Sequence, residues 1–541
     1  MKYLTRWRAI AGWLWMATLA LNAADKADNR KLYILYTNDV HGGIVETEAT
    51  FLNPNFPPVL GGGASAAAII KNVRERAQKE GAAVLLLDAG DIFQGTPLGT
   101  RTGGTAIIDY MNAVGYDAVS AGNHDFDLGK DNLARLVERA RFPILSANII
   151  EKETGKPWRY VKPWTLLDKQ GIKIGIFGLT TEATKNMSFA EHIKGLDFTD
   201  ESPAAQRAVD TLRAMGADIV IGLVHMGLPY NTEEGWRQLQ EEIRQNIHKT
   251  SYLNAMELAH YVKGIDILMG GHIHKGYPQP WVDPENHTIC FQNYGNGGNL
   301  GMAEILIDKA THTIAGYELP SDNSGLLLLT TDEYWPDPEM AALIRKRQAE
   351  VEKGFDEVIG VTEQALTRAQ GESPMNNLIC DAMLEASGAD FAFTNFGGIR
   401  SDLPIGPITP RDIFRVLPFG NAIVVLKIRG AMLRGLIERK VRGNRSGMAI
   451  GGGRVVYKRN APDGQKIVSF TINGKPLDDN AWYKVATTDY LAEGNSGLDA
   501  LAEVPEERID RTGIILREAV TEYVRNHSPL KIKTDGRWVK Q

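Results

Sequence analysis

Five polar clusters, each following an apolar run typical of a β-strand, contain the residue types that bind metal ions. They lie at residues 38–41, 90–91, 122–125, 224–225 and 271–274. Imidazole, carboxylate and amide oxygen are ligands of zinc- and manganese-type ions. A pair of such ions about 4 Å apart can hold both the attacking and the leaving oxygen of a phosphoryl transfer. The clusters therefore predict a two-metal hydrolase.

The spacing within the clusters suggests how the ligands divide between two ions. Asp39 and His41 are two residues apart, so on an extended strand end both side chains would lie on one face. Asp91 follows Gly90, which allows a sharp turn, and its carboxylate is our candidate for the group that bridges the ions. We expect the first ion to be held by Asp39, His41, Asp91 and His274, and the second by Asp91, Asn123, His225 and His272. A single histidine is more often a surface or core residue, but five clusters in one context favour ligands.

An alternation of apolar strands with helical stretches from about residue 31 to 325 predicts a layered α/β domain. We expect strands at 32–36, 83–87, 118–120, 172–178, 218–223 and 265–269, and helices at 64–79, 131–140, 203–215 and 254–262. Every cluster follows one of these strands. Open α/β sheets place their sites at strand ends, so the clusters should meet there.

The chain changes character after this alternation. Residues 336–357 are charged and amphipathic, with few positions for deep burial, and are typical of a helix connecting two domains. From 358 onward, a strand at 358–361 and a helix at 375–387 precede Gly-rich turns and short strands, without another metal-type cluster. We therefore expect a first domain at 25–335, a linker helix at 336–357 and a second α/β domain at 358–541.

Length and composition agree with two or three globular domains. The chain has 541 residues, 43% of them hydrophobic and 23% charged, and its net charge of −6 gives no reason to expect nucleic-acid binding. Cys290 and Cys380 are the only cysteines, so no disulfide framework holds the fold. We interpret Cys380 as a buried thiol in a helix, with a disulfide to Cys290 as the minor alternative.

The N-terminus predicts export. Basic residues at positions 2, 6 and 8 precede an apolar stretch at 9–21 and two alanines, Ala23 and Ala24, which is the layout of a cleavable signal peptide at 1–24. The apolar stretch is shorter than the ~20 residues that span a bilayer, and no cysteine near the cleavage site could accept lipid. We therefore expect a periplasmic or secreted protein without a stable membrane anchor.

These motifs resemble the calcineurin-like metallophosphoesterases, and with the second domain the resemblance narrows to the exported 5'-nucleotidase family, which includes UDP-sugar hydrolases. It covers nearly the whole mature chain. It implies a four-layer α/β sandwich that binds two divalent ions such as Zn or Mn, and a second α/β nucleotide-binding domain that rotates about the linker helix. In this family the histidine of Gly-Asn-His, here His124, stabilises charge on the phosphoryl group and is oriented by an aspartate, here Asp127. Asp125 is expected to have a structural role.

The resemblance also assigns substrate contacts in the second domain. The family motif Asn-x-Gly-Gly-Ile-Arg is present at 395–400, with Asn395 facing the base and Arg400 able to hold a phosphate or carboxylate. Phe419 and Tyr490 match the two aromatic residues that sandwich the base. Arg368 is a further candidate, although its spacing differs from the family pattern by about one residue.

One position departs from the family. Relatives bind the ribose hydroxyls with an aspartate where this chain has Ser496. A carboxylate that accepts two hydroxyl hydrogen bonds discriminates more strongly than one serine. We expect a substrate preference that depends less on the ribose diol, unless Asn495 or Asp499 compensates.

The function implied is release of phosphate from nucleotides by a water that the metals activate, without a separate general base. Within the same chemistry, the alternatives are hydrolysis of UDP-sugars, of dinucleotide diphosphates or of cyclic nucleotides, because the fold does not fix the leaving group. A non-catalytic nucleotide-binding protein and a sulfur-ester hydrolase are more distant hypotheses. The retained ligand positions together with His124 and Asp127 argue against the former.

Overall fold

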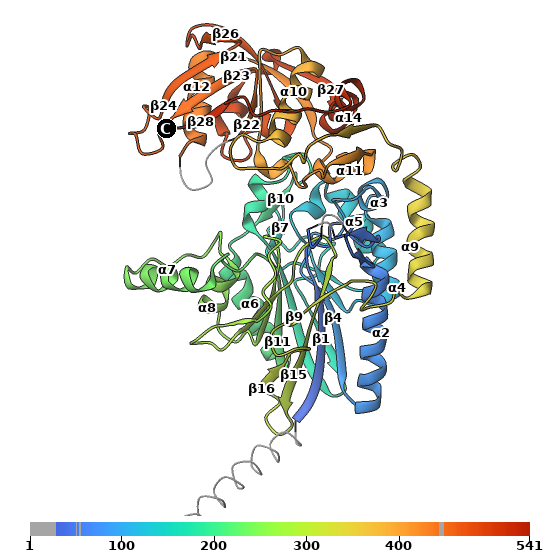
Figure 1. Ribbon diagram of the computed structural model, residues 1–541. Coiled ribbons are helices and arrows are strands. Elements are labelled where there is room, and N and C mark those ends of the chain that lie inside the picture. The colour runs from blue at the N-terminus through green and yellow to red at the C-terminus, as the bar shows by residue number, and fades with distance from the viewer. Residues whose placement is uncertain (1–28, 50, 54–55, 443–447) are drawn as a thin grey trace, which may run out of the picture.

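The computed structural model describes residues 29–49, 51–53, 56–442 and 448–541. Figure 1 shows two α/β units, the first domain below and the second domain, coloured orange to red, above it. The predicted signal peptide, residues 1–24, lies outside the described residues. Within the described part of the chain, we find no helix of the length and apolar character needed to cross a membrane.

A seven-stranded sheet and a six-stranded sheet form the centre of the first domain. The first sheet has the order β16-β15-β1-β4-β5-β6, with β17 also paired to β15, and the second has the order β13-β14-β12-β11-β9-β8. The first sheet contains β1 (Asn29–Thr37), β4 (Ala83–Asp88), β5 (Ala118–Ser120), β6 (Ile144–Leu145), β15 (Asn299–Asp308), β16 (Ile314–Glu318) and β17 (Leu326–Leu328). The second contains β8 (Trp164–Lys169), β9 (Ile172–Thr180), β11 (Ile219–His225), β12 (Ile267–Gly270), β13 (Trp281–Val282) and β14 (Ile289–Gln292).

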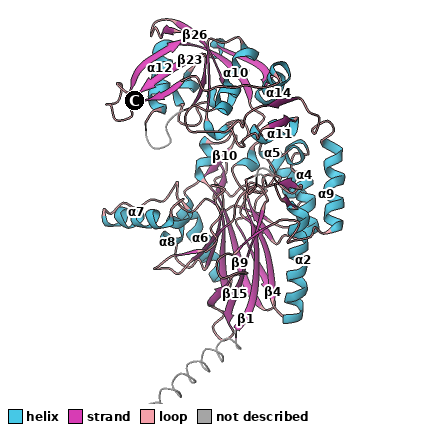
Figure 2. Ribbon diagram, in the orientation of Figure 1, coloured by secondary structure: helices cyan, strands magenta, loops and turns pink. Residues whose placement is uncertain are grey.

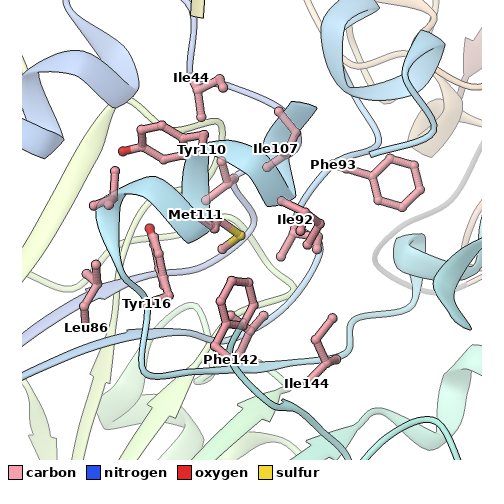
Figure 3. Packing of buried hydrophobic residues seen from close by; sticks show 14 of the residues in the cluster. Ile44, Leu86, Ile92, Phe93, Ile107, Tyr110, Met111, Tyr116, Phe142 and Ile144 are labelled. Carbon is pink, nitrogen blue, oxygen red and sulfur yellow. The ribbon is translucent and has the colours of Figure 1, made fainter. Parts of the chain in front are cut away.

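The sheets pack face to face with helices on both outer faces, which confirms the predicted mixed α/β fold and its four layers (Figure 2). Leu32 and Ile34 of β1 share one buried core with Ile174 of β9 and Ile219 of β11. Figure 3 shows the core on the outer face of the first sheet, where α4 contributes Ile107 and Met111. The outer helices are α2 (Gly62–Glu80), α4 (Thr105–Val114) and α5 (Lys130–Arg139) on one side and α6 (Glu201–Ala214), α7 (Thr232–Arg244) and α8 (Ala255–Tyr261) on the other.

The second domain is built on a five-stranded sheet of order β22-β19-β26-β21-β27. Its strands are β19 (Phe391–Thr394), β21 (Ala422–Arg429), β22 (Ala449–Gly451), β26 (Trp482–Thr488) and β27 (Ile509–Ile515). One face is covered by α10 (Pro374–Ser387), α11 (Pro410–Val416) and α14 (Leu516–His527). The other packs against α12 (Gly430–Lys440) and a four-stranded sheet of β23 (Gly453–Tyr457), β24 (Ile467–Ile472), β25 (Lys475–Pro476) and β28 (Trp538–Lys540).

The connecting helix is attached to the first domain. It is α9 (Pro338–Val351), which begins with the N-cap Asp337 and packs on α2, α4 and the short helix α3 (Pro97–Arg101). Ala341 and Ile344 are the buried residues of this helix and lie in the first-domain core, which agrees with the expectation of few deeply buried positions. After the helix ends, Phe355 reaches the second domain, where its ring centroid lies 6.0 Å from that of Phe414.

Both cysteines are buried and free. Cys380 lies in α10, which confirms its interpretation as a buried thiol. The alternative disulfide is wrong, because Cys290 lies in β14 of the other domain.

Candidate active site

The five polar clusters converge at one edge of the two sheets. β1, β4 and β5 run parallel in the first sheet, and β9, β11 and β12 run parallel in the second, so their carboxyl ends meet. Two groups of possible metal ligands result, with the donor atoms of each group within 4.8 Å of one another. One consists of Asp39, His41 and His274, and the other of Asp91, His225 and His272.

In the first group the Nε2 atoms of His41 and His274 face each other at 3.0 Å. Nδ1 of His41 donates to the backbone oxygen of Gln94 at 2.6 Å, which leaves its Nε2 as a lone-pair donor toward the site. Asp39 is fully buried, and its carboxylate accepts from the side-chain amide of Asn38 at 2.7 Å and from the backbone amide of His272 at 2.8 Å. These contacts fix both ligands before any ion is bound.

Asp91 lies between the two groups. Its Oδ2 is 2.9 Å from Nε2 of His225 and 3.7 Å from Nε2 of His41, which is the placement expected of a bridging carboxylate. Oδ1 of Asn123 lies 3.1 Å from Nε2 of His225 and 2.9 Å from Nδ1 of His272, so the amide oxygen joins the second group. The structure thus brings together all seven residues that the sequence assigned to metal binding.

The backbone conformation that aims these ligands differs from the expected one. Five of the seven ligand candidates have a positive φ, between 49° and 73°: Asp39, His41, Asp91, His272 and His274. The extended strand end that we invoked for Asp39 and His41 is therefore wrong, because β1 ends at Thr37 and both residues lie in the left-handed region of the following loop. Such conformations cost free energy and are concentrated at functional sites.

The donor set fits a pair of cations. Burial lowers the pKa of His41 and of His272 to about 3, so both rings are neutral and offer lone pairs. Nε2 of His274 accepts from the Arg400 guanidinium at 3.1 Å, so this nitrogen is also unprotonated. Unprotonated ring nitrogens beside the buried Asp39 and Asp91 carboxylates form a donor set that suits cations. Burial opposes protonation of His225, but the Asp91 and Asp39 carboxylates raise its pKa to about 10, so an ion bound there would displace a proton.

His124 borders the two groups without belonging to either. Its Nδ1 donates to Oδ2 of Asp127 at 2.9 Å, and its backbone amide donates to Oδ1 of Asp91 at 2.8 Å. Burial opposes the charged ring, but Asp127 and Asp91 together raise the pKa of His124. The ring is therefore held in a form that can face an anion.

Asp125 accepts three backbone hydrogen bonds that shape the metal loops. The donors are the amides of Gly122 at 2.8 Å, Asp91 at 3.1 Å and Ile92 at 3.0 Å. The carboxylate thus ties the Gly90–Asp91 turn to the turn that carries Asn123, as its expected structural role requires. Burial raises the pKa of Asp125 to about 7.

The second domain completes the site through Arg400 and Phe419. The Arg400 guanidinium donates to His274, and burial lowers the pKa of Arg400 although the nearby Asp91 and Asp39 carboxylates partly oppose this shift. The Phe419 ring stacks on His124 with centroids 5.1 Å apart and an interplanar angle of 29°. A cation from this domain therefore contacts the first metal-ligand group, and an aromatic face covers the neighbouring His124.

Tyr490 contacts a different part of the first domain. Its ring meets that of Phe189 edge-on, with ring centroids 6.0 Å apart. Burial raises the pKa of Tyr490, and the nearby Asp127 carboxylate also acts to raise it. Asn395 occupies the N-cap position of the short 3₁₀ helix at Phe396–Gly398, beside the glycines of its motif, and its side chain makes no capping hydrogen bond. Arg368 donates to Asp402 at 3.1 Å and to the backbone oxygen of Ile399 at 3.2 Å, next to Arg400.

Ser496 has a positive φ of 59°, and its backbone oxygen accepts from the amino group of Lys440. Asp499 is paired with Arg439 at 3.3 Å, and 81% of the Asp499 side chain is exposed. Asn495 donates to the backbone oxygen of Tyr490 at 2.8 Å.

Sequence reasoning missed the residues that join the two domains. The side-chain amide of Gln94 donates to the backbone oxygen of Pro418, and the backbone amide of Ala190 donates to Glu493. Lys440, which donates to the backbone oxygen of Ser496 within the second domain, was also missed. No local pattern marks these residues, because each acts through a partner distant in the sequence or through a backbone atom.

Comparisons with known proteins agree with this geometry. Residues 32–276 match the calcineurin-like phosphoesterase family, and residues 358–503 match the C-terminal domain of the 5'-nucleotidases. A 5'-nucleotidase of Diplobatis ommata is 30% identical, with 94% of this chain and 89% of that protein aligned.

This chain belongs to the 5'-nucleotidase family.

Further members agree over the whole length. Protein UshA of Escherichia coli is 29% identical with 98% of both chains aligned. The crystal structure of a 5'-nucleotidase precursor from Thermus thermophilus is 27% identical and superposes with a TM-score of 0.80 over 94% of this chain and 99% of that one. The 5'-nucleotidase family member described here is accordingly a metal-dependent phosphoric ester hydrolase of the metallophosphoesterase class.

Proposed function

We propose that this protein is an exported 5'-nucleotidase that releases phosphate from nucleotides at a pair of divalent ions. The observation that carries the proposal is the placement of Asp91 between two ligand groups that face Arg400 and Phe419 of the second domain. Metal-ligand groups alone would suit any metallohydrolase. A guanidinium and an aromatic face above them suit a substrate that joins a phosphate to a planar base.

The seven ligand candidates would hold the two ions, Asp91 contacting both. When bound, the ions supply a water of lowered pKa and compensate the charge of the phosphate. His124, held by Asp127, faces the phosphoryl oxygens and stabilises the charge that develops there. Arg400 binds a phosphate oxygen, while Phe419 and Tyr490 contact the base, with Asn395 and Arg368 in supporting positions.

We also propose that the protein is exported and that its domains have the limits 25–335, 336–357 and 358–541. Residues 1–24 have the composition of a signal peptide, and a periplasmic or secreted enzyme would meet external nucleotides. Fractionation of cells that express the tagged full chain tests this: the protein should leave the cytoplasm shortened by about 24 residues, since that is the length of the predicted signal. Retention of a full-length product in the cytoplasm would contradict export.

Phosphate release from AMP, ATP and UDP-glucose by the metal-loaded protein tests the activity. We expect release from AMP that is abolished by chelation and restored by Zn²⁺ or Mn²⁺, and that is lost in Asp91→Ala and His124→Ala. Preferential turnover of UDP-glucose would shift the assignment to diphosphate hydrolysis. Nucleotide binding without any release would identify a binding protein and refute the proposal.

We also propose that the sugar contributes little to recognition. Support comes from Ser496, whose backbone is held by Lys440, and from Asp499, which is engaged by Arg439 at the surface. The ratio of kcat/KM for AMP to that for deoxy-AMP should be near one in the wild type and should rise about tenfold in Ser496→Asp, because a carboxylate can accept both hydroxyls. A strong ribose preference in the wild type would contradict this.

A further inference from the structure

Gln94 connects a metal-ligand candidate with the second domain. It lies three residues after Asp91 and is 3% exposed. Its backbone oxygen accepts from Nδ1 of His41 at 2.6 Å, and its side-chain Nε2 donates to the backbone oxygen of Pro418 at 3.0 Å. One buried residue thus contacts both the first ligand group and the loop that precedes Phe419.

The loop at residues 417–419 is held from both sides. From its own domain, the Arg517 guanidinium donates to the backbone oxygens of Leu417 at 3.1 Å and of Pro418 and Phe419 at 3.4 Å each. From the first domain, Gln94 donates to Pro418, the central carbonyl of the three. The Phe419 ring that this loop carries stacks on His124. A hydrogen bond that crosses the domain boundary therefore contacts the loop that carries this ring.

Stability does not explain a glutamine at this position. The Oε1 atom of Gln94 is buried and has no hydrogen-bond partner among the described residues. A buried unpaired acceptor costs free energy that an apolar side chain of similar length would avoid. The neighbouring Phe93 is fully buried in the core next to Ile92 (Figure 3), so the backbone that supports His41 is anchored independently of the Gln94 side chain.

We propose that Gln94 is a positioning residue that registers Phe419 over His124, and with it the base of the nucleotide over the phosphoryl site. The inference rests on the proposed nucleotidase function for its kinetic consequence. Gln94 touches neither the reacting atoms nor the base; its side chain acts through the Pro418 carbonyl. Its loss should therefore leave the metal ligands in place and impair only what Phe419 contributes.

The test compares Gln94→Met with a matched control and with removal of the ring. Methionine keeps the length of the side chain but removes the donor. In the control, Gln364→Met, the lost hydrogen bond runs to the backbone oxygen of Ile532 within the second domain. We expect Gln94→Met to lower kcat/KM for AMP about tenfold, with metal content unchanged and no loss of thermal stability, and Gln364→Met to retain wild-type kcat/KM.

A double-mutant cycle separates this role from a general structural one. If Gln94 acts through Phe419, adding Gln94→Met to Phe419→Ala should cause no further loss of kcat/KM. Hydrogen–deuterium exchange should also be faster at the amides of Phe419 and Gly420 in Gln94→Met and unchanged elsewhere. Additive losses in the cycle, or unchanged exchange at these amides, would overturn the inference.

The two proposals fail in different ways. If the wild type released no phosphate from AMP, the nucleotidase assignment would fall, but the exchange measurement and the affinity for AMP by calorimetry would still test Gln94. If the wild type were active and Gln94→Met were equally active with unchanged exchange, only the positioning role would fall.

Discussion

Glu201 is a buried carboxylate whose neutral form the fold favours, and its replacement should stabilise the protein at alkaline pH. It is the first residue of α6, is fully buried and accepts from the backbone amide of Glu182 at 2.8 Å through Oε1. Its Oε2 has no hydrogen-bond partner among the described residues. Burial, together with the nearby Glu182 carboxylate, raises the pKa of Glu201 from 4.5 to about 7.

The sign and the size of the effect follow from linkage. In the unfolded chain the carboxyl ionises near pH 4.5, whereas in the folded protein it stays protonated to about pH 7. Between these values the folded state binds more protons, so the free energy of unfolding falls as the pH rises. Each pKa unit corresponds to about 1.4 kcal/mol, which gives a loss of about 3 kcal/mol above pH 7 relative to pH below 4.5.

Glu201→Gln removes this loss while its amide oxygen can still accept from Glu182. We expect the difference in unfolding free energy between the variant and the wild type to grow by about 2 kcal/mol in favour of the variant from pH 5 to pH 8, measured by urea unfolding. Glu153→Gln, at an exposed position in the turn after β7 (Ile149–Glu151), serves as the control and should show no such growth. A difference between Glu201→Gln and the wild type that stays constant across this range would refute the reasoning.

Two further substitutions test the geometry of the site. A Cβ on Gly122 would lie 2.2 Å from Oδ1 of Asp91. Gly122→Ala should therefore displace this carboxylate and reduce kcat by roughly 100-fold or more. Gly316→Ala, where nothing lies within 4 Å of the added atom, is the control and should leave kcat unchanged. Asp127→Asn keeps an acceptor for Nδ1 of His124 but removes the charge. Phosphate-release kinetics should show a kcat reduced about 10-fold with a nearly constant KM. An unchanged kcat would contradict the role of the pair.

Strand-end logic explains why the metal ligands could be predicted from the sequence. Each cluster follows an apolar run, and parallel strands bring their carboxyl ends to one edge, so Asp91, Asn123 and His225 meet without any knowledge of side-chain contacts. The two-residue spacing placed Asp39 and His41 in one group, but His272 and His274, spaced in the same way, belong to different groups. The reason given for Asp39 and His41 was nevertheless wrong, because side-chain types do not report the left-handed backbone that aims them.

The connecting helix shows what the pattern could not specify, namely the domain to which the helix is attached. Its sequence is charged and amphipathic, which predicted a connector with few positions for deep burial, and Ala341 and Ile344 dock it on the first domain. Contacts across the domain boundary could not be predicted at all, since the Gln94 to Pro418 bond joins residues 324 positions apart through a backbone oxygen.

The division of the site between two domains separates two requirements. All seven metal-ligand candidates and His124 belong to the first domain, so the chemistry of phosphate release is set there. The groups that would recognise the rest of the substrate, Phe419 and Tyr490, belong to the second, and each is placed by a contact with the first domain, to His124 and Phe189 respectively. Changes in the second domain can therefore alter which phosphate ester is chosen while the metal ligands stay in place, and Ser496→Asp is the substitution that tests this separation.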